Sequence, residues 1–193
     1  MQNALVVIDY INDLVHPDGK RRMYARQVSE NQVLAQVNKA VAWARKTSTL
    51  VVFVKVGFSP DYRDLPTGSP FFSSLAEAGA LRLGRWGTEF HEDLDVQSDD
   101  LIVIKHRINP FYSTRLEAIL RAVKVTDIYF SGVGTTWAIQ SAVRTAHDMD
   151  YNVFVISDAC AAASEEEHLQ SLTTLSHLST LCTADDLKAS FVR

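Results

Sequence analysis

Short apolar runs alternate with longer segments of helical periodicity along this chain. Six runs are rich in β-branched and aromatic residues, as strands buried on both faces are, and the last of the six is the weakest. They span residues 4–8, 49–56, 101–105, 127–131, 152–157 and 180–183. The pattern therefore predicts six strands.

Four segments between these runs predict helices. They span residues 29–46, 114–123, 135–149 and 164–177. Three of them begin with a Ser or Thr followed three residues later by Glu or Gln, which is the pattern of a capping box that satisfies the first free amides of a helix. The three pairs are Ser29 with Gln32, Thr114 with Glu117, and Ser164 with Glu167.

The order of strands and helices predicts the fold class. A strand, a crossover helix and the next strand form a parallel unit, and successive units cover both faces of the sheet. We therefore expect an α/β protein, a single-domain three-layer α/β/α sandwich with a mostly parallel six-stranded sheet of Rossmann-like type. The 193 residues fit one such domain, spanning 1–193.

The segment 57–100 departs from this alternation. It holds Pro60, Pro66 and Pro70 together with several glycines and aromatic residues. It is too long for a plain connection, and long insertions of this kind are often lids or binding loops. We expect it to be a lid or insertion within the single domain.

Composition narrows the choice of partners and compartment. The net charge of −4 excludes the broad basic surface of a nucleic-acid-binding protein. The first residues lack the basic start and long apolar run of a signal peptide, and no apolar stretch is long enough to span a bilayer. With two cysteines, Cys160 and Cys182, and no disulfide framework, we expect a reduced, cytoplasmic protein without a membrane partner.

Polar residues at the ends of the predicted strands are the candidates for chemistry, since ligands of an open parallel sheet bind outside the carboxyl ends of its strands. Asp9 follows the first strand and Lys105 ends the third. Taken singly, each has an ordinary interpretation, a carboxylate that caps a turn and a lysine that emerges into solvent. Together they predict a carboxylate and its charge partner at adjacent strand ends.

The turn after the fourth strand is the second candidate. It reads Gly132, Val133, Gly134 and Thr135 and leads into a helix. Two glycines allow a ligand to approach the backbone closely, and the free N–H groups of the helix favour an anion. The alternative is a tight turn that needs glycine for steric reasons alone, and both interpretations can hold together.

Four motifs resemble the isochorismatase-like hydrolases of the cysteine hydrolase superfamily. They are VVID at 6–9 followed by Asn12 and Asp13, VIKHR at 103–107 with FYST at 111–114, GVGT at 132–135 continuing through Ala138 to Tyr151, and DACA at 158–161. The motifs occur in the order and at the spacing of that family over nearly the whole chain. The resemblance implies the isochorismatase-like form of the α/β fold.

The resemblance also implies a role for each site residue. The family's aspartate at the Asp9 position is a general acid/base, and its lysine at the Lys105 position is the partner of that aspartate. A cysteine at the Ala138 position is the usual nucleophile. The bond between Val133 and Gly134 is usually cis, and its amide helps to form the oxyanion hole. This chain resembles a member that lacks the nucleophilic cysteine, because Ala138 stands in its place.

Without a thiolate the usual covalent route to amide hydrolysis is closed. The isochorismatase branch also lacks the cysteine and hydrolyses a vinyl ether, releasing pyruvate and a dihydroxycyclohexadiene acid. The resemblance thus implies a hydrolase of a small carboxylate-bearing substrate in which Asp9 donates the proton and Lys105 orients Asp9 or holds a substrate carboxylate. A lysine beside Asp9 favours the ionised carboxylate, so the acid role requires desolvation or substrate charge to raise its pKa.

Two alternatives stay open beside this hydrolase. One is a catalytically silent protein of the same fold that binds a small molecule or a partner. The other is an amidase whose cysteine has been replaced by Ala138. No metal is expected, because the second strand leads into Gly57, Phe58, Ser59 and Pro60 without the histidine ligands of nicotinamidases, and no cofactor is expected either.

Substrate binding is assigned to the turn and to nearby cations and aromatic rings. Val133 and Gly134 would contribute the turn. Arg107, with Arg82 or Arg85 as alternatives, would bind a carboxylate, since a guanidinium matches its geometry. Phe58, Trp86, Tyr112 and Trp137 are candidate pocket walls that also have core-packing alternatives. The resemblance implies a homo-oligomer, either a dimer or a tetramer.

Overall fold

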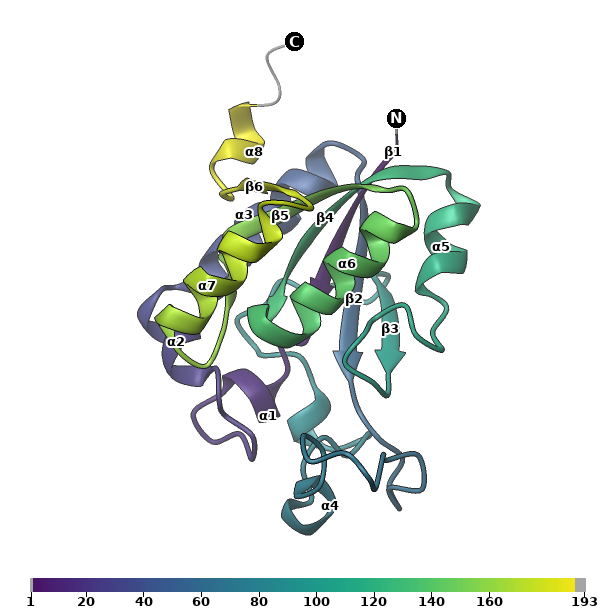
Figure 1. The fold of residues 1–193 in the computed structure, drawn as a ribbon, viewed down its shortest axis with the longest axis vertical. Helices are drawn as coiled ribbons and strands as arrows, with labels where there is room; N and C mark the ends of the chain where they lie inside the picture. Colours follow the sequence, from purple (N-terminus) through teal and green to yellow (C-terminus); the bar gives the residue numbers. More distant parts are fainter. Residues whose placement is uncertain (1, 190–193) are drawn as a thin grey trace.

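A computed structural model describes residues 2–189, and its centre is one six-stranded sheet (Figure 1). The strand order is β3-β2-β1-β4-β5-β6, and every neighbouring pair is parallel. The strands are β1 Gln2–Ile8, β2 Leu50–Val56, β3 Leu101–Lys105, β4 Val125–Val133, β5 Asn152–Ala161 and β6 Thr180–Cys182. The predicted α/β class and six-stranded sheet are confirmed.

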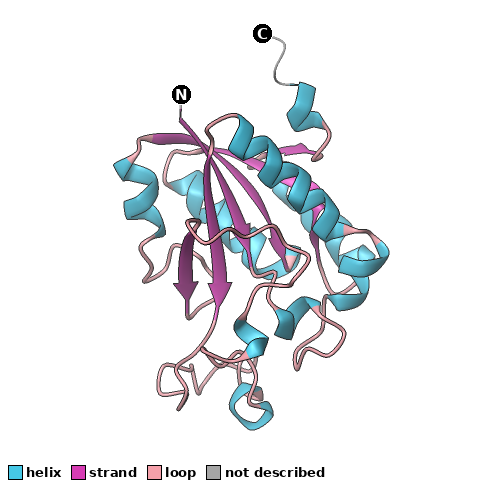
Figure 2. Ribbon diagram, turned by 180° about the vertical axis from the view of Figure 1, so that it is seen from behind, coloured by secondary structure: helices cyan, strands magenta, loops and turns pink. Residues whose placement is uncertain are grey.

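Helices cover both faces of the sheet, which gives the predicted three layers (Figure 2). One apolar core contains Leu5 and Val7 of β1 with α3 Val33–Lys46 and α8 Asp186–Ala189. The other contains Val6 and Ile8 with α5 Leu116–Ala122, α6 Gln140–Asp148 and α7 Glu165–Leu175. Because successive side chains of β1 point to opposite faces, an unbroken apolar run serves both cores.

Several short helices lie outside this framework. They are α1 Asn12–Val15, α2 Ala25–Glu30, α4 Leu75–Ala78, a 3-10 turn η1 Trp86–Thr88 and a π-helical turn η2 Thr135–Ile139 that leads into α6. The segment between β2 and β3 carries α4 and η1 and lies beyond the carboxyl ends of these strands (Figure 1). It therefore covers these strand ends, and we call residues 57–100 the covering segment.

The buried carboxylate of Asp13 holds this segment against the rest of the domain. It accepts a hydrogen bond from the amide of Leu81 at 2.6 Å and another from the amide of Lys20 at 3.1 Å. One side chain of α1 thus fixes two loops that meet over the strand ends.

The capping boxes show where the helix boundaries differ from prediction. Ser164 caps α7 as predicted, accepting from the amide of Glu167 at 3.2 Å. The Ser29 box is wrong, because Ser29 lies inside α2 and the left-handed Gln32, at φ 52°, separates α2 from α3. The hydroxyl of Thr114 accepts from the amide of Leu116 rather than from that of Glu117, and α5 begins at Leu116.

Strand β5 runs further than the predicted end at residue 157. Its register against β4 shifts between the pairs Phe130–Val155 and Gly132–Cys160, so residues 156–159 form a bulge. In the bulge the Asp158 carboxylate accepts from the amide of Ala184 at 2.8 Å. Asp158, which opens the fourth motif, therefore fixes the chain that follows β6.

No helix within residues 2–189 is both long and apolar enough to cross a membrane.

We predict that Ser164→Ala lowers the free energy of unfolding by about 1 kcal/mol, because it removes the cap of α7. Ser29→Ala is the matched control, since its hydroxyl caps nothing, and it changes that free energy by less than about 0.5 kcal/mol. Urea denaturation of both variants measures the difference. Equal losses for the two serines would contradict the assignment of the cap.

Candidate active site

A cavity lies at the carboxyl ends of β1, β2, β3 and β4. Its polar side chains are Asp9, Arg21, Tyr24, Lys105 and Arg107. The rest of the wall is mainly apolar, and the segment between β2 and β3 supplies Phe71, Phe72, Leu75 and Leu81. The site is therefore a small set of polar groups enclosed by hydrocarbon, an arrangement typical of small-molecule sites.

Asp9 and Lys105 form a buried ion pair on the cavity wall. Lys105 Nζ lies 2.7 Å from Asp9 Oδ2, and the two side chains are 2% and 4% exposed. The amide of Val56 donates to Asp9 Oδ1 at 2.7 Å, and Lys105 Nζ also donates to the carbonyls of Arg107 and Ile108, each at 3.2 Å. Both charges are thus paired and hydrogen-bonded, which buried charges require.

The strands that carry this pair are not adjacent, which corrects the prediction. Strand β2 lies between β1 and β3, and its last residue, Val56, donates the amide that reaches Asp9. The long side chain of Lys105 spans the intervening strand. Asp9 adopts a left-handed conformation, with φ 66°, which turns the chain sharply at the end of β1.

Burial raises the pKa of Asp9 above its ordinary value of 3.8. The charge of Lys105 and the hydrogen bonds from Lys105 and Val56 act in the opposite direction, but they do not outweigh the loss of solvent around the carboxylate. Desolvation thus supplies the effect that a proton-donating role for Asp9 requires.

The turn after β4 forms another part of the wall. The Val133–Gly134 peptide bond is cis, as the resemblance implies. A Cβ atom on Gly132 would lie 2.7 Å from the carbonyl oxygen of Ile8, and one on Gly134 would lie 2.5 Å from the hydroxyl of Tyr24. Both glycines are therefore required by close packing. Ala138 follows in η2, is buried, and lines the cavity.

The cavity wall contains Ala138 and, among the described residues, no cysteine. Cys160 is buried in a core cluster, where burial raises the pKa of its thiol to about 12. Burial likewise raises the pKa of Cys182 to about 11. Both thiols are protonated at neutral pH, and neither is placed to attack a ligand in this cavity.

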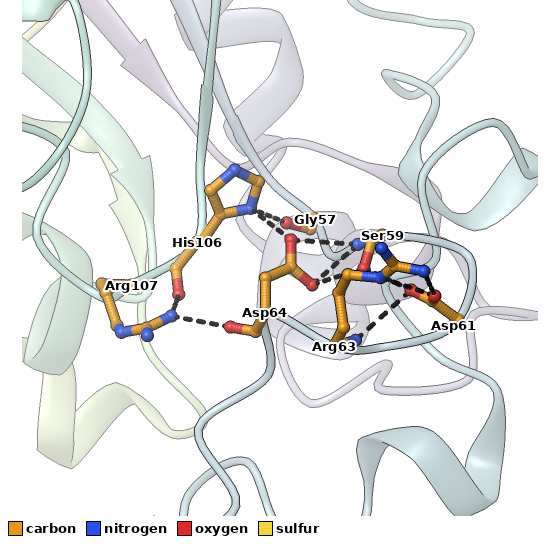
Figure 3. Close-up of polar contacts among 7 residues, drawn as sticks. All are labelled: Gly57, Ser59, Asp61, Arg63, Asp64, His106 and Arg107. Carbon is orange, nitrogen blue, oxygen red and sulfur yellow. Dashed lines mark hydrogen bonds and ion pairs between the residues drawn. The ribbon is translucent and has the colours of Figure 1, made fainter.

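Arg107 is anchored at the cavity by a polar cluster at the base of the covering segment (Figure 3). Its Nη1 atom donates to the carbonyls of Asp64 at 3.1 Å and His106 at 2.5 Å. The Asp64 carboxylate accepts from the amide and hydroxyl of Ser59 and lies 3.4 Å from His106 Nδ1. The same nitrogen lies 2.6 Å from the carbonyl oxygen of Gly57. The cluster fixes one edge of the guanidinium.

The aromatic candidates separate into two groups. Trp137 lines the cavity although its side chain is partly exposed, whereas Phe58, Trp86 and Tyr112 do not line it. Phe58 is fully buried against Phe72, 5.5 Å away between ring centroids, and so belongs to the core of the covering segment. Tyr112 is 62% exposed in a neighbouring groove.

Trp86 and the two alternative arginines lie elsewhere. Trp86 is 47% exposed and meets the ring of His16 edge-on. Together with Arg82 and Arg85 it lines a separate surface groove. Neither arginine therefore shares the cavity with Asp9. Of the three arginines considered from the sequence, only Arg107 does.

Sequence reasoning missed two polar residues of the site. Arg21 belongs to the basic run Lys20, Arg21 and Arg22, which on its own predicts a solvated loop, but it lines the cavity and its Nη1 donates to Ser74 Oγ at 3.1 Å. Tyr24 is buried beside it. The basic run was the only available signal for Arg21, and nothing marked Tyr24. Within residues 2–189, no cluster of three or more His, Cys, Asp or Glu side chains could hold a metal ion.

Comparison with known proteins places this geometry in a family. The model of the isochorismatase domain matches residues 3–186. The chain is similar to the ureidoacrylate amidohydrolase RutB of Pseudomonas syringae pv. syringae (strain B728a), with 27% identity over 180 residues, which cover 86% of this chain and 73% of that protein.

Two solved structures have the same fold over nearly their whole length. An isochorismatase family protein from Burkholderia thailandensis has a TM-score of 0.80 at 28% identity, covering 97% of this chain and 94% of its own. One from Desulfovibrio vulgaris subsp. vulgaris str. Hildenborough has a TM-score of 0.87 at 22% identity, covering 100% and 99%. Because the family model also spans almost the whole chain, this protein belongs to the isochorismatase family of hydrolases.

Proposed function

We propose that this hydrolase cleaves a small carboxylate-bearing vinyl ether without a covalent intermediate, with Asp9 as general acid and base. The observation that carries the proposal is the buried Asp9–Lys105 pair on a cavity wall that presents Ala138 and no cysteine among the described residues. A carboxyl group in such a wall can donate a proton, whereas a nucleophile for acyl transfer is absent from it.

The reaction divides into proton transfer and hydration. Asp9 donates its proton to the terminal methylene carbon, and the ether-bearing carbon becomes an oxocarbenium ion. Water adds to that carbon while the Asp9 carboxylate accepts the water's proton. The resulting hemiketal collapses to pyruvate and the ring alcohol. Lys105 stabilises the carboxylate between the two proton transfers, and the raised pKa of Asp9 supports the first of them.

Two guanidinium groups at the cavity support a substrate with two carboxylates. Arg107 is anchored through Nη1, and Arg21 reaches the cavity from the loop after α1. A planar guanidinium binds a carboxylate better than an ammonium does, because it offers parallel N–H groups. Isochorismate carries two carboxylates and is therefore the first substrate to test.

The covering segment limits the space in which such a substrate can bind. The cavity holds about 40 Å³, which is room for a few water molecules rather than a six-membered ring. Binding of isochorismate therefore requires the wall formed by Phe71, Phe72 and Leu75 to shift outward. This requirement supports the interpretation of residues 57–100 as a lid.

We predict that wild-type protein releases pyruvate from isochorismate and that Asp9→Asn lowers kcat by about 10²–10⁴-fold, because the amide cannot donate or accept the proton. Asp158→Asn is the matched control, because this aspartate lies outside the cavity, where its carboxylate accepts from the amide of Ala184. We expect this variant to leave kcat unchanged. A coupled lactate dehydrogenase assay measures pyruvate. Equal activity of Asp9→Asn and wild type would exclude the mechanism.

We predict that kcat/KM falls as pH rises through the pKa of Asp9, because the protonated carboxyl is the active form. The pKa is raised by burial, so the falling limb lies above the range of an exposed aspartate. Lys105→Met removes the opposing positive charge and moves this limb to higher pH. Initial rates across the pH range, with the melting temperature as a check of folding, test this. A rate that climbs with pH through the same range would identify Asp9 as a base only.

The name of the relative RutB supports amide hydrolysis as a second candidate. We predict that wild type does not consume ureidoacrylate and that Ala138→Cys does not acquire this activity, because the site is organised for proton transfer to carbon. Loss of ureidoacrylate, followed by chromatography, is the measurement. Turnover by the cysteine variant would instead favour an amidase with a replaced nucleophile.

A catalytically silent binding protein would hydrolyse neither isochorismate nor ureidoacrylate, yet isochorismate would still raise its melting temperature.

A further inference from the structure

The hydroxyl of Tyr24 opens on the cavity and has no hydrogen-bond partner among the described residues. The side chain is 4% exposed and lines the cavity, yet no residue within 2–189 accepts from or donates to its hydroxyl. Two other tyrosine hydroxyls bond to the backbone: Tyr10 donates to the carbonyl of Ala159, and Tyr62 donates to that of Ala80 at 2.8 Å. Tyr24 thus presents an unused donor to the cavity.

Close packing fixes the position of this hydroxyl. The Tyr24 ring occupies the space that a side chain on Gly134 would fill, since an ideal Cβ there would lie 2.5 Å from Oη and 2.6 Å from Cζ. The backbone of Tyr24 is held by hydrogen bonds with Leu14 at 3.3 Å and Val28 at 2.9 Å. The phenol is therefore set against the turn that carries the cis peptide and Ala138, and its position does not depend on a ligand.

Burial, with a contribution from nearby charges, keeps the hydroxyl of Tyr24 protonated. Burial raises its pKa well above the ordinary value of 10, and the negative charges of Asp9 and Glu167 raise it further, whereas Arg21 acts in the opposite direction. At neutral pH the group is consequently a neutral hydrogen-bond donor. Tyr24 and Asp9 also line the same cavity, so the phenol and the reacting carboxyl face one space.

We infer that Tyr24 is a substrate-binding residue of this site, whose hydroxyl donates a hydrogen bond to an oxygen atom of the bound substrate. No group of the described fold uses this donor, and it faces the cavity, so a bound substrate can accept its hydrogen bond. The neighbouring guanidinium of Arg21 makes a substrate carboxylate the matching acceptor. The inference rests on the proposed function for the identity of that substrate but not for the position of the donor.

The test compares Tyr24→Phe with Tyr151→Phe. The Tyr151 hydroxyl is unpaired as well, but it is buried, its ring lies under Arg121, and the residue does not line the cavity. Both variants lose a hydroxyl that bonds to nothing in the fold, so both keep or exceed the wild-type melting temperature. Only Tyr24→Phe lowers kcat/KM for isochorismate, by about 10- to 100-fold, the effect of losing one hydrogen bond to a buried polar group.

Binding separates failure of this inference from failure of the proposed reaction. If wild type does not hydrolyse isochorismate, the proposed function fails, and Tyr24 is then judged by the rise in melting temperature that isochorismate produces. A smaller rise in Tyr24→Phe than in wild type and Tyr151→Phe supports the inference. Equal rises, or equal kinetics where turnover occurs, overturn it. A lower melting temperature for ligand-free Tyr24→Phe, with Tyr151→Phe unchanged, would assign the hydroxyl to the fold and also overturn it.

Discussion

The burial of one ion pair sets the conditions that the rest of the site must satisfy. A carboxylate and an ammonium group are stable away from water only when they pair and when their remaining hydrogen-bonding positions are filled. For Asp9 and Lys105 this requires the amide of Val56 and two carbonyls beyond β3 to lie around them. The ends of β1, β2 and β3 must therefore meet at one level, which a parallel sheet provides.

The covering segment completes the desolvation that the sheet begins. Phe71, Phe72 and Leu75 add an apolar wall to the cavity that Asp9 lines, and the carboxylate of Asp9 has one cation, Lys105, in contact. The raised pKa of Asp9 is the result of this balance. Asp13 contributes indirectly to this balance. Its carboxylate accepts hydrogen bonds from the amide of Leu81 in the covering segment and from the amide of Lys20 in the loop after α1.

The features that the sequence predicted are those that follow from local pattern. Apolar runs located the strands, and polar residues at or directly after the strand ends pointed to Lys105 and Asp9. The order of the strands is not a local property, so the separation of β1 and β3 by β2 was not foreseen. Arg21 and Tyr24 were missed for a related reason, since their loop reaches the cavity through contacts that no sequence pattern records. The cavity does not include Phe58, Trp86 and Tyr112, which were candidates for its walls. An aromatic residue in the sequence does not reveal the direction in which its side chain points.

Ala138 changes what the same charge pair can accomplish. A carboxylate beside a cysteine takes the thiol proton, and its pKa must then be low enough for it to be ionised before reaction. With a methyl group at that position there is no proton to take, and a carboxyl group whose pKa is raised by burial becomes useful as a donor. Under the proposed mechanism, one substitution thus reverses the direction of the first proton transfer while the fold around it stays the same.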